Sequence, residues 1–310
     1  MISKHHLKSK IKATGNIRQI TKAMEMVAAS KMRKSEQTAL KARPYAKKAL
    51  SLLRNIASYS VKEKLKSPYF KEGPGSKICL VVVTSDRGLC GAFNGQVLRL
   101  AAKFIREHKT AEALDMVAVG KKSKDYFHRI GIKPKAEFCD FSEIATLYDV
   151  QPLADWIIER FQKKEYNRVV FCSTLFISAL KQRVELNQAL PLTITELTKI
   201  IDNITPKYGK YSEIRGKEQE AESGFYLFEP SAQSVFDRLV LDLIRVAILH
   251  LIYESNASEH SSRMMAMKNA TENAENILED LSRRLNRARQ EEITRELTEI
   301  SSAREALSLE

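Results

Sequence analysis

The sequence predicts an α/β domain joined to a long antiparallel coiled coil that the two ends of the chain form together. Two observations support this fold class. The 80 residues from Ser231 to Glu310 contain no glycine and no proline, so nothing in them punctuates a helix. The middle of the 310-residue chain instead alternates apolar β-branched runs with helical segments. Such alternation is typical of a mostly parallel sheet that helices cover on both faces.

The first predicted element is a coiled-coil helix within residues 1–65, which begins near Ser3. Its apolar side chains repeat at the spacing of one helix face, which indicates an amphipathic helix; they are Ile17, Ile20, Met24 and Val27, with Ala28 and Met32 widening the stripe. We expect this stripe to meet the last helix of the chain. Proline lacks a backbone N–H and clashes with the preceding turn, so we expect Pro44 to kink or interrupt the helix.

The predicted α/β domain spans residues 76–224. We expect its strands at 78–83, 116–119, 136–139, 168–176 and 184–194, and its helices at 97–108, 121–129 and 153–164. The first of these strands, 78–83, is an apolar β-branched run that ends in the turn-rich segment 84–91. The end of the domain, from 197 to 224, is polar and rich in Lys and Glu, which predicts a mobile connection.

The last predicted element is a single helix over residues 231–310. Ser231 is a favourable N-cap residue and follows a proline. Further along, apolar side chains recur at a mean spacing of 3.5 residues, which predicts a left-handed coiled coil; they are Met267, Ala270, Ala274, Ile277, Leu281, Leu285 and Ala288. At about 1.5 Å per residue such a helix is roughly 115 Å long, too long for one compact core. We therefore expect a mechanical role.

The net charge of +13 is concentrated near the N-terminus. Residues 1–48 contain ten Lys, three Arg and two Glu, a net charge of +11. So many like charges repel one another unless an acidic surface lies nearby. The segment thus predicts an acidic partner, which could be nucleic acid, an anionic membrane or an acidic protein.

Targeting and redox signals are weak in this sequence. The first residues are basic and polar, and no apolar segment of a secretory signal follows them. The most apolar stretch, 235–253, holds four charged residues, which argues against a membrane span. The four cysteines lie far apart and form no CxxC, so we expect reduced, mostly buried thiols.

Motifs for bound ligands are incomplete. The segment 120–123, Gly-Lys-Lys-Ser, resembles the end of a phosphate loop, but its upstream glycine is missing. The segment 85–91 follows the first strand, where a nucleotide would bind, yet it lacks GxGxxG. The histidines show no metal-ligand spacing. We predict no catalytic residue, no cofactor and no metal in this chain, while a nucleotide-dependent enzyme remains an open alternative.

Four blocks resemble the gamma subunit of F-type ATP synthase, bacterial type, in order and position. They are Ile20-Thr21-Lys22-Ala23-Met24-Glu25-Met26-Val27-Ala28-Ala29-Ser30-Lys31-Met32-Arg33-Lys34, then Ser85 to Gly91, then Glu259 to Met264 with Met267 to Thr271, and finally Ala288-Arg289-Gln290 leading to Ile293 through Ile300. The first and last blocks are the most specific, and the resemblance spans nearly the whole chain.

The resemblance implies an architecture and a function. Two terminal helices form an asymmetric coiled coil inside a hexamer of alpha and beta subunits, and a central Rossmann-like domain, which binds no nucleotide, rests with the epsilon subunit on the membrane c-ring. Proton (or sodium) flow turns the ring and this shaft, which couples ion transport to ATP synthesis or hydrolysis. The catalytic sites belong to the hexamer. The implied location is the cytoplasmic face of the bacterial inner membrane, as a peripheral membrane protein.

The resemblance also implies site residues. Lys31, Arg33 and Lys34 match a basic region that faces acidic loops of beta, and Arg289, Gln290 and Thr294 match positions that touch beta higher on the shaft. Glu259 and Arg263 match polar positions linked to coupling, and Met24 is expected opposite them on the first helix. The tip, residues 301–310, departs from the family in being more charged, and Gly15 interrupts a stretch that is normally helical throughout.

A basic coiled-coil protein that binds nucleic acid is a further alternative. It predicts DNA affinity that falls steeply with salt. Such a protein would be expected to intersperse aromatic side chains among its basic ones, yet Tyr45 is the only aromatic residue before Tyr59. The sequence therefore favours the shaft over this alternative.

Overall fold

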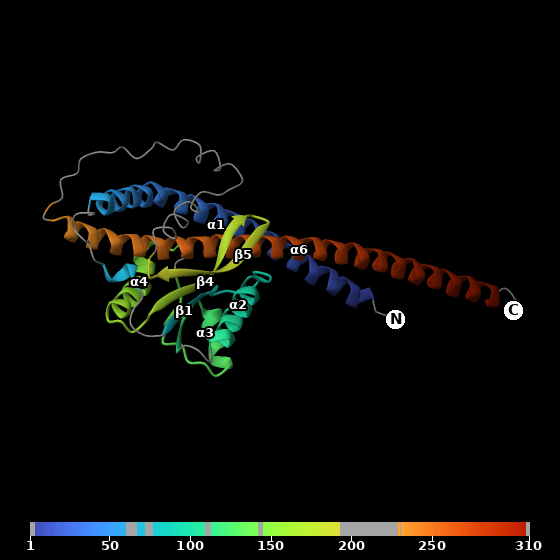
Figure 1. The fold of residues 1–310 in the computed structure, drawn as a ribbon. Helices are drawn as coiled ribbons and strands as arrows, with labels where there is room; N and C mark the ends of the chain where they lie inside the picture. The colour runs from blue at the N-terminus through green and yellow to red at the C-terminus, as the bar shows by residue number, and fades with distance from the viewer. Residues whose placement is uncertain are drawn as a thin grey trace. The chain divides into compact units, whose positions relative to one another are not determined.

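The computed structural model describes residues 4–59, 67–71, 77–108, 113–141, 145–192, 229 and 231–307. The chain divides into two compact units, which we describe separately. The first unit combines Met1–Val27 with Met264–Glu310, and the second is Ala28–Arg263. Helices α1 (Lys4–Tyr59) and α6 (Ala232–Leu307) contribute residues to both units (Figure 1). The connection predicted at 197–224 lies outside the described residues.

A five-stranded sheet forms the centre of the second unit. Its strands are β1 (Ile78–Val83), β2 (Leu114–Val119), β3 (Ala136–Phe138), β4 (Arg168–Ser178) and β5 (Lys181–Leu190), in the order β3-β2-β1-β4-β5. The pairs β3–β2, β2–β1 and β1–β4 are parallel, whereas β5 pairs antiparallel with β4. Only two residues connect β4 to β5, and so short a connection permits only an antiparallel pair. The predicted mostly parallel sheet is confirmed.

Helices connect the parallel strands of this sheet. They are α2 (Phe93–His108), α3 (Lys121–Arg129) and α4 (Leu147–Gln162), and a short 3₁₀ helix, η1 (Pro68–Phe70), precedes β1. The prediction gave α3 its observed bounds but began α4 six residues too late. Thr146 caps α4: its hydroxyl accepts a bond from the N–H of Asp149, whose carboxylate accepts the N–H of Thr146. This reciprocal cap fixes the start of the helix ahead of its apolar residues.

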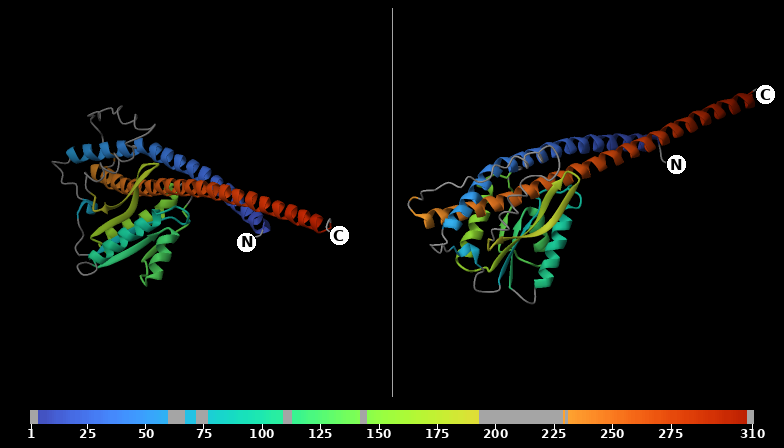
Figure 2. Two further views of the ribbon diagram at one scale, coloured as in Figure 1. Left: turned by 90° about the vertical axis from the view of Figure 1, so that its right-hand side faces the viewer. Right: turned by 45° about the horizontal axis from the view of Figure 1, so that its top comes forward.

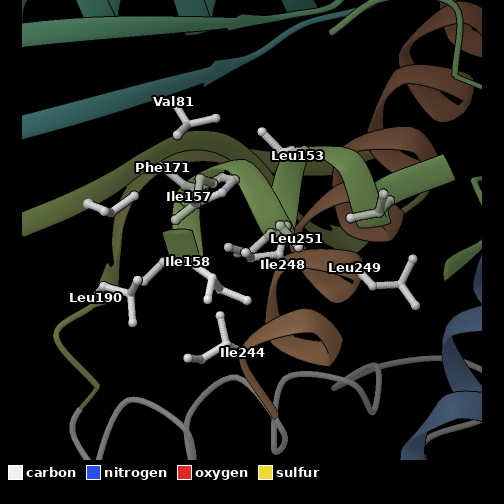
Figure 3. Close-up of a cluster of buried hydrophobic side chains, with 14 of the residues drawn as sticks. Val81, Leu153, Ile157, Ile158, Phe171, Leu190, Ile244, Ile248, Leu249 and Leu251 are labelled. Carbon is white, nitrogen blue, oxygen red and sulfur yellow. The ribbon is translucent and has the colours of Figure 1, made fainter. Parts of the chain in front are cut away.

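Side chains of β1 alternate between two apolar layers. Cys79, Val81 and Val83 face the layer formed with α4 and α6, and the alternate residues face the layer formed with α2 and α3. Figure 3 shows the first layer, in which Ile157 of α4 and Ile248 of α6 converge near Phe171 of β4. The first part of α6 is thus a structural layer of the α/β domain.

Two further predictions concern Pro44 in α1 and the start of α6. Helix α1 continues from Lys4 to Tyr59 with Pro44 inside it, so of the two expected effects, a kink or an interruption, the interruption does not occur. Helix α6 begins at Ala232, and the hydroxyl of Ser231 accepts a bond from the N–H of Ser234 at 3.2 Å. Ser231 therefore acts as the predicted N-cap.

The first unit is an antiparallel pair formed by the first part of α1 and the last part of α6 (Figure 2). The hydroxyl of Thr271 donates to that of Thr21 at 2.9 Å, and Arg18 pairs with Glu275 at 3.6 Å. Lys4 then pairs with Glu292. Because the partner number rises along α6 as it falls along α1, the helices run in opposite directions, and the predicted antiparallel coiled coil is confirmed.

The residues at this helix seam agree only in part with those predicted. Ile17, Ile20 and Val27 of α1 are 53%, 59% and 52% exposed, and Ile277 of α6 is 51% exposed, so these four are wrong as buried positions. In the same predicted stripe of α1, Ala28 and Met32 are buried and Met24 is half-buried. Buried or half-buried positions of α6 follow a strict alternation of four and three, in which Thr271 and Leu278 join five predicted residues; they are Met267, Thr271, Ala274, Leu278, Leu281, Leu285 and Ala288. Small and hydroxyl-bearing residues let the two backbones approach, while the larger isoleucines face outward.

Candidate functional site

The loop at the carboxyl end of β1 forms the base of the candidate site. The strand order reverses between the paired strands β1 and β4, and ligands of open α/β folds bind at such switch points. Residues 84–91 occupy this edge. What this loop contacts therefore decides what the site can do.

The loop is bonded to the N-terminus of α3. Asp86 accepts a bond from the N–H of Lys121 at 2.9 Å, and the hydroxyl of Thr84 accepts the N–H of Ser123 at 2.8 Å. The carbonyl of Ser85 accepts the intervening N–H, that of Lys122. The N–H groups at the start of α3, which could otherwise hold a phosphate, are thus bonded within the chain. Residues 120–123 form an ordinary strand-to-helix turn.

Gly120 is needed for this close approach. Its φ is +87°, and a Cβ atom at this position would lie 2.2 Å from the carbonyl oxygen of Thr84. Real Cβ atoms essentially never come so near a backbone atom. A glycine that first suggested a phosphate loop therefore serves to let the end of β1 pack on the start of α3.

The second side of the loop meets α6. The guanidinium of Arg263 donates to the carbonyl oxygens of Gly88, at 3.3 Å, and of Arg87, at 3.4 Å. It also pairs with Glu259 at 2.7 Å. Arg263 is 9% exposed, so these bonds replace water as its partners. The sequence-predicted pair of Glu259 and Arg263 is brought together and is joined to a loop that the prediction did not connect with it.

Burial controls the charge of Glu259. Removal from water raises the pKa of the Glu259 carboxyl above its ordinary value, and the guanidinium of Arg263 beside it acts in the opposite direction. Lys31 also lowers this pKa through its charge, which places Lys31 in the electrostatic neighbourhood of Glu259. One of the three basic residues assigned to a beta contact is therefore also part of this cluster.

The other predicted residues lie on helices and are exposed or half-buried. In the second unit Arg33 and Lys34 are exposed, and Lys31 is half-buried. In the first unit Met24 is half-buried, whereas Arg289, Gln290 and Thr294 are exposed. All of residues 289–300 of α6 are exposed. The cationic and polar side chains expected to meet beta are thus accessible to a partner.

Serines of α6 contribute contacts that the sequence reasoning missed. The hydroxyl of Ser261 donates to the carbonyl of Ala179 at 2.5 Å and accepts from Gln182 at 3.0 Å. Ser258, which is fully buried, contacts the carbonyl of Thr174. Small hydroxyl side chains at spacing three on one face could have signalled a close contact between α6 and the β4–β5 hairpin.

The part of the chain that the structure describes contains neither a metal-binding cluster nor a membrane-spanning helix. There, three or more His, Cys, Asp or Glu side chains never gather in a way that could hold a metal ion. Among the described helices, none has the length and apolar character needed to cross a membrane.

Comparisons with known proteins identify the family. The model of the ATP synthase family matches residues 3–307. An ATP synthase gamma chain from Pelotomaculum thermopropionicum is 36% identical over 307 residues, which are 99% of this chain and 100% of the relative. The gamma chain from Herpetosiphon aurantiacus is 34% identical, over 99% of this chain and 100% of the relative.

Solved structures agree with this result at the level of fold. A chain of the Euglena gracilis mitochondrial ATP synthase, solved as OSCP/F1/c-ring in rotational state 3, aligns with a TM-score of 0.61 and 16% identity over 98% of this chain and 94% of that one. A chain of the Tetrahymena thermophila central stalk/c-ring aligns at 0.57 and 23% identity over 81% and 99%. The chain therefore belongs to the ATP synthase gamma-chain family.

Proposed function

We propose that this chain turns as the shaft of a proton-translocating F1Fo ATP synthase and transmits torque between a membrane c-ring and a hexamer of alpha and beta subunits, with epsilon as a further partner. The catalytic residues belong to the hexamer, and this chain contributes none. The observation that carries the proposal is the continuity of α6. One helix of 76 residues supplies a core layer of the α/β domain at its start and a fully exposed surface near its end. A continuous helix of this kind is suited to transmit rotation.

The proposed contacts with beta divide into two groups. Lys31, Arg33 and Lys34 face acidic loops of beta, and Arg289, Gln290 and Thr294 touch beta farther along the shaft. Exposure of Arg33, Lys34 and the α6 group supports this assignment. Exposed ion pairs are worth only about 0–1 kcal/mol each. Weak contacts suit a surface that must slide past several partners in turn.

The proposed coupling region consists of Met24, Glu259 and Arg263. Support for the last two is their ion pair and the bonds from Arg263 to the loop after β1. Through these contacts, force on the loop and force on α6 act on the same guanidinium. We place the assembled protein at the cytoplasmic face of the bacterial inner membrane, where it is held peripherally by its partners.

The test of this function is ATP hydrolysis by purified alpha and beta subunits of the same source, with and without this chain, while the size of the complex is followed. We expect one stable complex and a manyfold rise in turnover. Absence of the chain from the complex, with unchanged turnover, would contradict the shaft, and salt-dependent DNA binding would then be measured.

Variants locate the contacts within the same assay. Arg289→Ala and Lys31→Ala are expected to lower turnover severalfold, because each removes a weak contact that the moving shaft makes repeatedly. Arg106→Ala is the matched control, since Arg106 is exposed on α2 and outside the proposed contact surface. Equal turnover in all three variants would reject the assigned contacts and leave the shaft itself intact.

A further inference from the structure

Helix α6 is held on the α/β domain by two kinds of contact. Over residues 236–253 its buried side chains are mostly large and apolar, and they belong to the core layer shared with the sheet and α4. Directly after this stretch the buried residues are small and polar: Ser255, Ser258 and Ser261 are 2%, 0% and 0% exposed. Apolar contacts have no preferred direction, so they resist separation of two surfaces more than sliding. Hydrogen bonds need a defined geometry and therefore resist both.

The small serines bring α6 close to the hairpin of β4 and β5, which lies beside it (Figure 1). The hydroxyl of Ser258 lies 3.5 Å from the carbonyl oxygen of Thr174 in β4. The hydroxyl of Ser261 donates to the carbonyl of Ala179 in the turn of the hairpin. The helix is thus bonded to the hairpin at two points that lie about one helical turn apart.

Gln182 of β5 adds a third and more restrictive connection. Its amide nitrogen donates to the hydroxyl of Ser261 at 3.0 Å, and its amide oxygen accepts the hydroxyl of Ser262 at 3.3 Å. The same nitrogen lies 3.3 Å and 3.2 Å from the carbonyl oxygens of Ser178 and Ala179 in its own hairpin. Both ends of one amide therefore bond to α6, while the nitrogen also contacts the hairpin turn.

This arrangement fixes the rotation of α6 about its own axis. Consecutive residues of an α-helix project about 100° apart, because one turn holds 3.6 residues. Gln182 bonds to two consecutive residues, so a rotation of the helix that moves Ser261 toward the amide moves Ser262 away from it. Sliding along the axis is opposed by Ser258, one turn away, at the carbonyl of Thr174.

We propose that Gln182 is a positioning residue that locks the rotational position of α6 on the α/β domain, so that torque passes between the domain and the shaft without slip. Ser261 and Ser262 are its partners on the helix. The lock lies within the second unit of the chain and needs no contact with another subunit. This inference rests on the proposed function, since a rotational lock matters only if the chain transmits torque.

The experiment uses the full chain assembled with alpha and beta subunits that are fixed to a surface. A bead is attached to α4 through Tyr148→Cys, an 84% exposed position, in a chain that also carries Cys139→Ser. While the shaft pauses between steps, the variance of the bead angle reports how firmly the domain is fixed to α6. Protons pumped per ATP hydrolysed are measured in complexes that include the membrane sector.

Three variants are compared in this chain. Gln182→Leu removes both polar ends of the amide at similar size, whereas Gln182→Glu keeps an acceptor for Ser262 but loses the donor to Ser261. Gln188→Leu is the matched control, because Gln188 is also a half-buried glutamine of β5 but donates to the carbonyl of Pro191 instead of α6.

Loss of directional bonds in Gln182→Leu is expected to raise the variance of the bead angle about twofold or more and to lower protons pumped per ATP about twofold. Gln182→Glu should lie between this variant and the unmodified chain. Hydrolysis without the membrane sector stays unchanged, because the contacts with the hexamer are untouched. Gln188→Leu leaves the variance and the pumping ratio unchanged.

Unfolding in denaturant is followed in parallel through Trp156, because a merely structural role of Gln182 would lower stability without raising the variance. Unchanged variance in Gln182→Leu would overturn the inference, and so would a raised variance with an unchanged pumping ratio. If Gln182→Leu fails to assemble, Gln182→Glu and Ser262→Ala decide the question by the same two readouts. Failure of the proposed function is distinguishable, because the unmodified chain itself would then neither assemble nor rotate.

Discussion

The two units of this chain bury different kinds of side chain. The sheet of the second unit is enclosed by large apolar residues such as Phe171 and Ile157, which are 0% and 1% exposed. The seam of the first unit is built around Thr21, Thr271 and Ala274, and its isoleucines point outward. Large apolar residues are therefore buried in the second unit, where helices cover the sheet. In the first unit the exposed isoleucines are left for a partner subunit to cover, as we expect.

The largest effect is expected from a substitution that leaves a cavity in the core of the second unit. Phe171→Ala is expected to lower the free energy of unfolding by about 3–5 kcal/mol, because it leaves a cavity at a fully buried site. Trp156, the only tryptophan, lies in α4 and reports on this unit in denaturant titrations. A loss below about 1 kcal/mol would show that the second unit is not held by this core.

A glycine-to-alanine substitution, with a second one as its control, tests the close approach of β1 and α3. Gly120→Ala is expected to cost at least about 2 kcal/mol, since the new methyl meets Thr84 and the backbone has a positive φ. Gly95→Ala is its control: the position is in α2, nothing lies within 4 Å, and alanine should stabilise the helix by about 0.5–1 kcal/mol. The same titration measures both, and equal effects would contradict the packing described.

Substitutions at the contact between Thr21 and Thr271 in the first unit are expected to have smaller, non-additive effects on stability. Thr21→Val or Thr271→Val alone is expected to cost about 1 kcal/mol, because the bond between the two hydroxyls is lost and the remaining hydroxyl keeps only the carbonyl partner on its own helix. The double variant should cost less than the sum of the singles, since either single change already removes the shared bond. Hydrogen exchange of α1 residues 14–27 measures the effect. Strict additivity would mean that the two hydroxyls do not interact.

Substitution of the exposed isoleucines Ile17 and Ile20 tests whether a partner subunit covers the first unit. Ile17→Ser with Ile20→Ser is expected to change the stability of the chain by less than about 0.5 kcal/mol, because both are exposed. Affinity for the alpha and beta subunits should fall at least tenfold, about 1.4 kcal/mol, if those subunits cover the residues. Titration of labelled chain into the hexamer measures this, and unchanged affinity would show that those subunits do not cover Ile17 and Ile20.

The smallest expected effect concerns pH. The pKa of Glu259 is raised on folding above its ordinary value of 4.5, mainly by burial. The charged form is thus disfavoured in the folded state, so the resulting penalty is absent below pH 4.5 and grows as the pH rises through the folded pKa. Glu259→Gln should flatten the fall in stability over that window. A steeper fall in the variant would reverse the assigned direction.

Much of the fold follows from local sequence patterns. Strands and helices of the α/β domain were predictable because β-branched runs, turn residues and helix periodicity agree there. The start of β5 and the start of α4 were not, because a two-residue turn and a capping box set them rather than apolar periodicity. Pro44 did not interrupt α1, although proline usually disfavours a helix interior.

The candidate site was less predictable than the fold. Glu259 and Arg263 lie one helical turn apart, so their ion pair could be expected from spacing. The bonds from Arg263 to Arg87 and Gly88 join residues about 175 positions apart, and no local pattern marks them. The seam was misjudged for a related reason: the sequence shows which face of α1 is apolar, but not which face the chain itself covers.

The most direct test of a rotor is to watch it turn. The unmodified alpha and beta subunits would be fixed to a surface and assembled with a chain carrying Tyr148→Cys, an 84% exposed position, and Cys139→Ser to remove the one thiol that is not buried. With a gold bead on residue 148, addition of ATP is predicted to produce stepwise rotation in one direction. A bead that stays still or only fluctuates while the same complexes hydrolyse ATP would contradict the account.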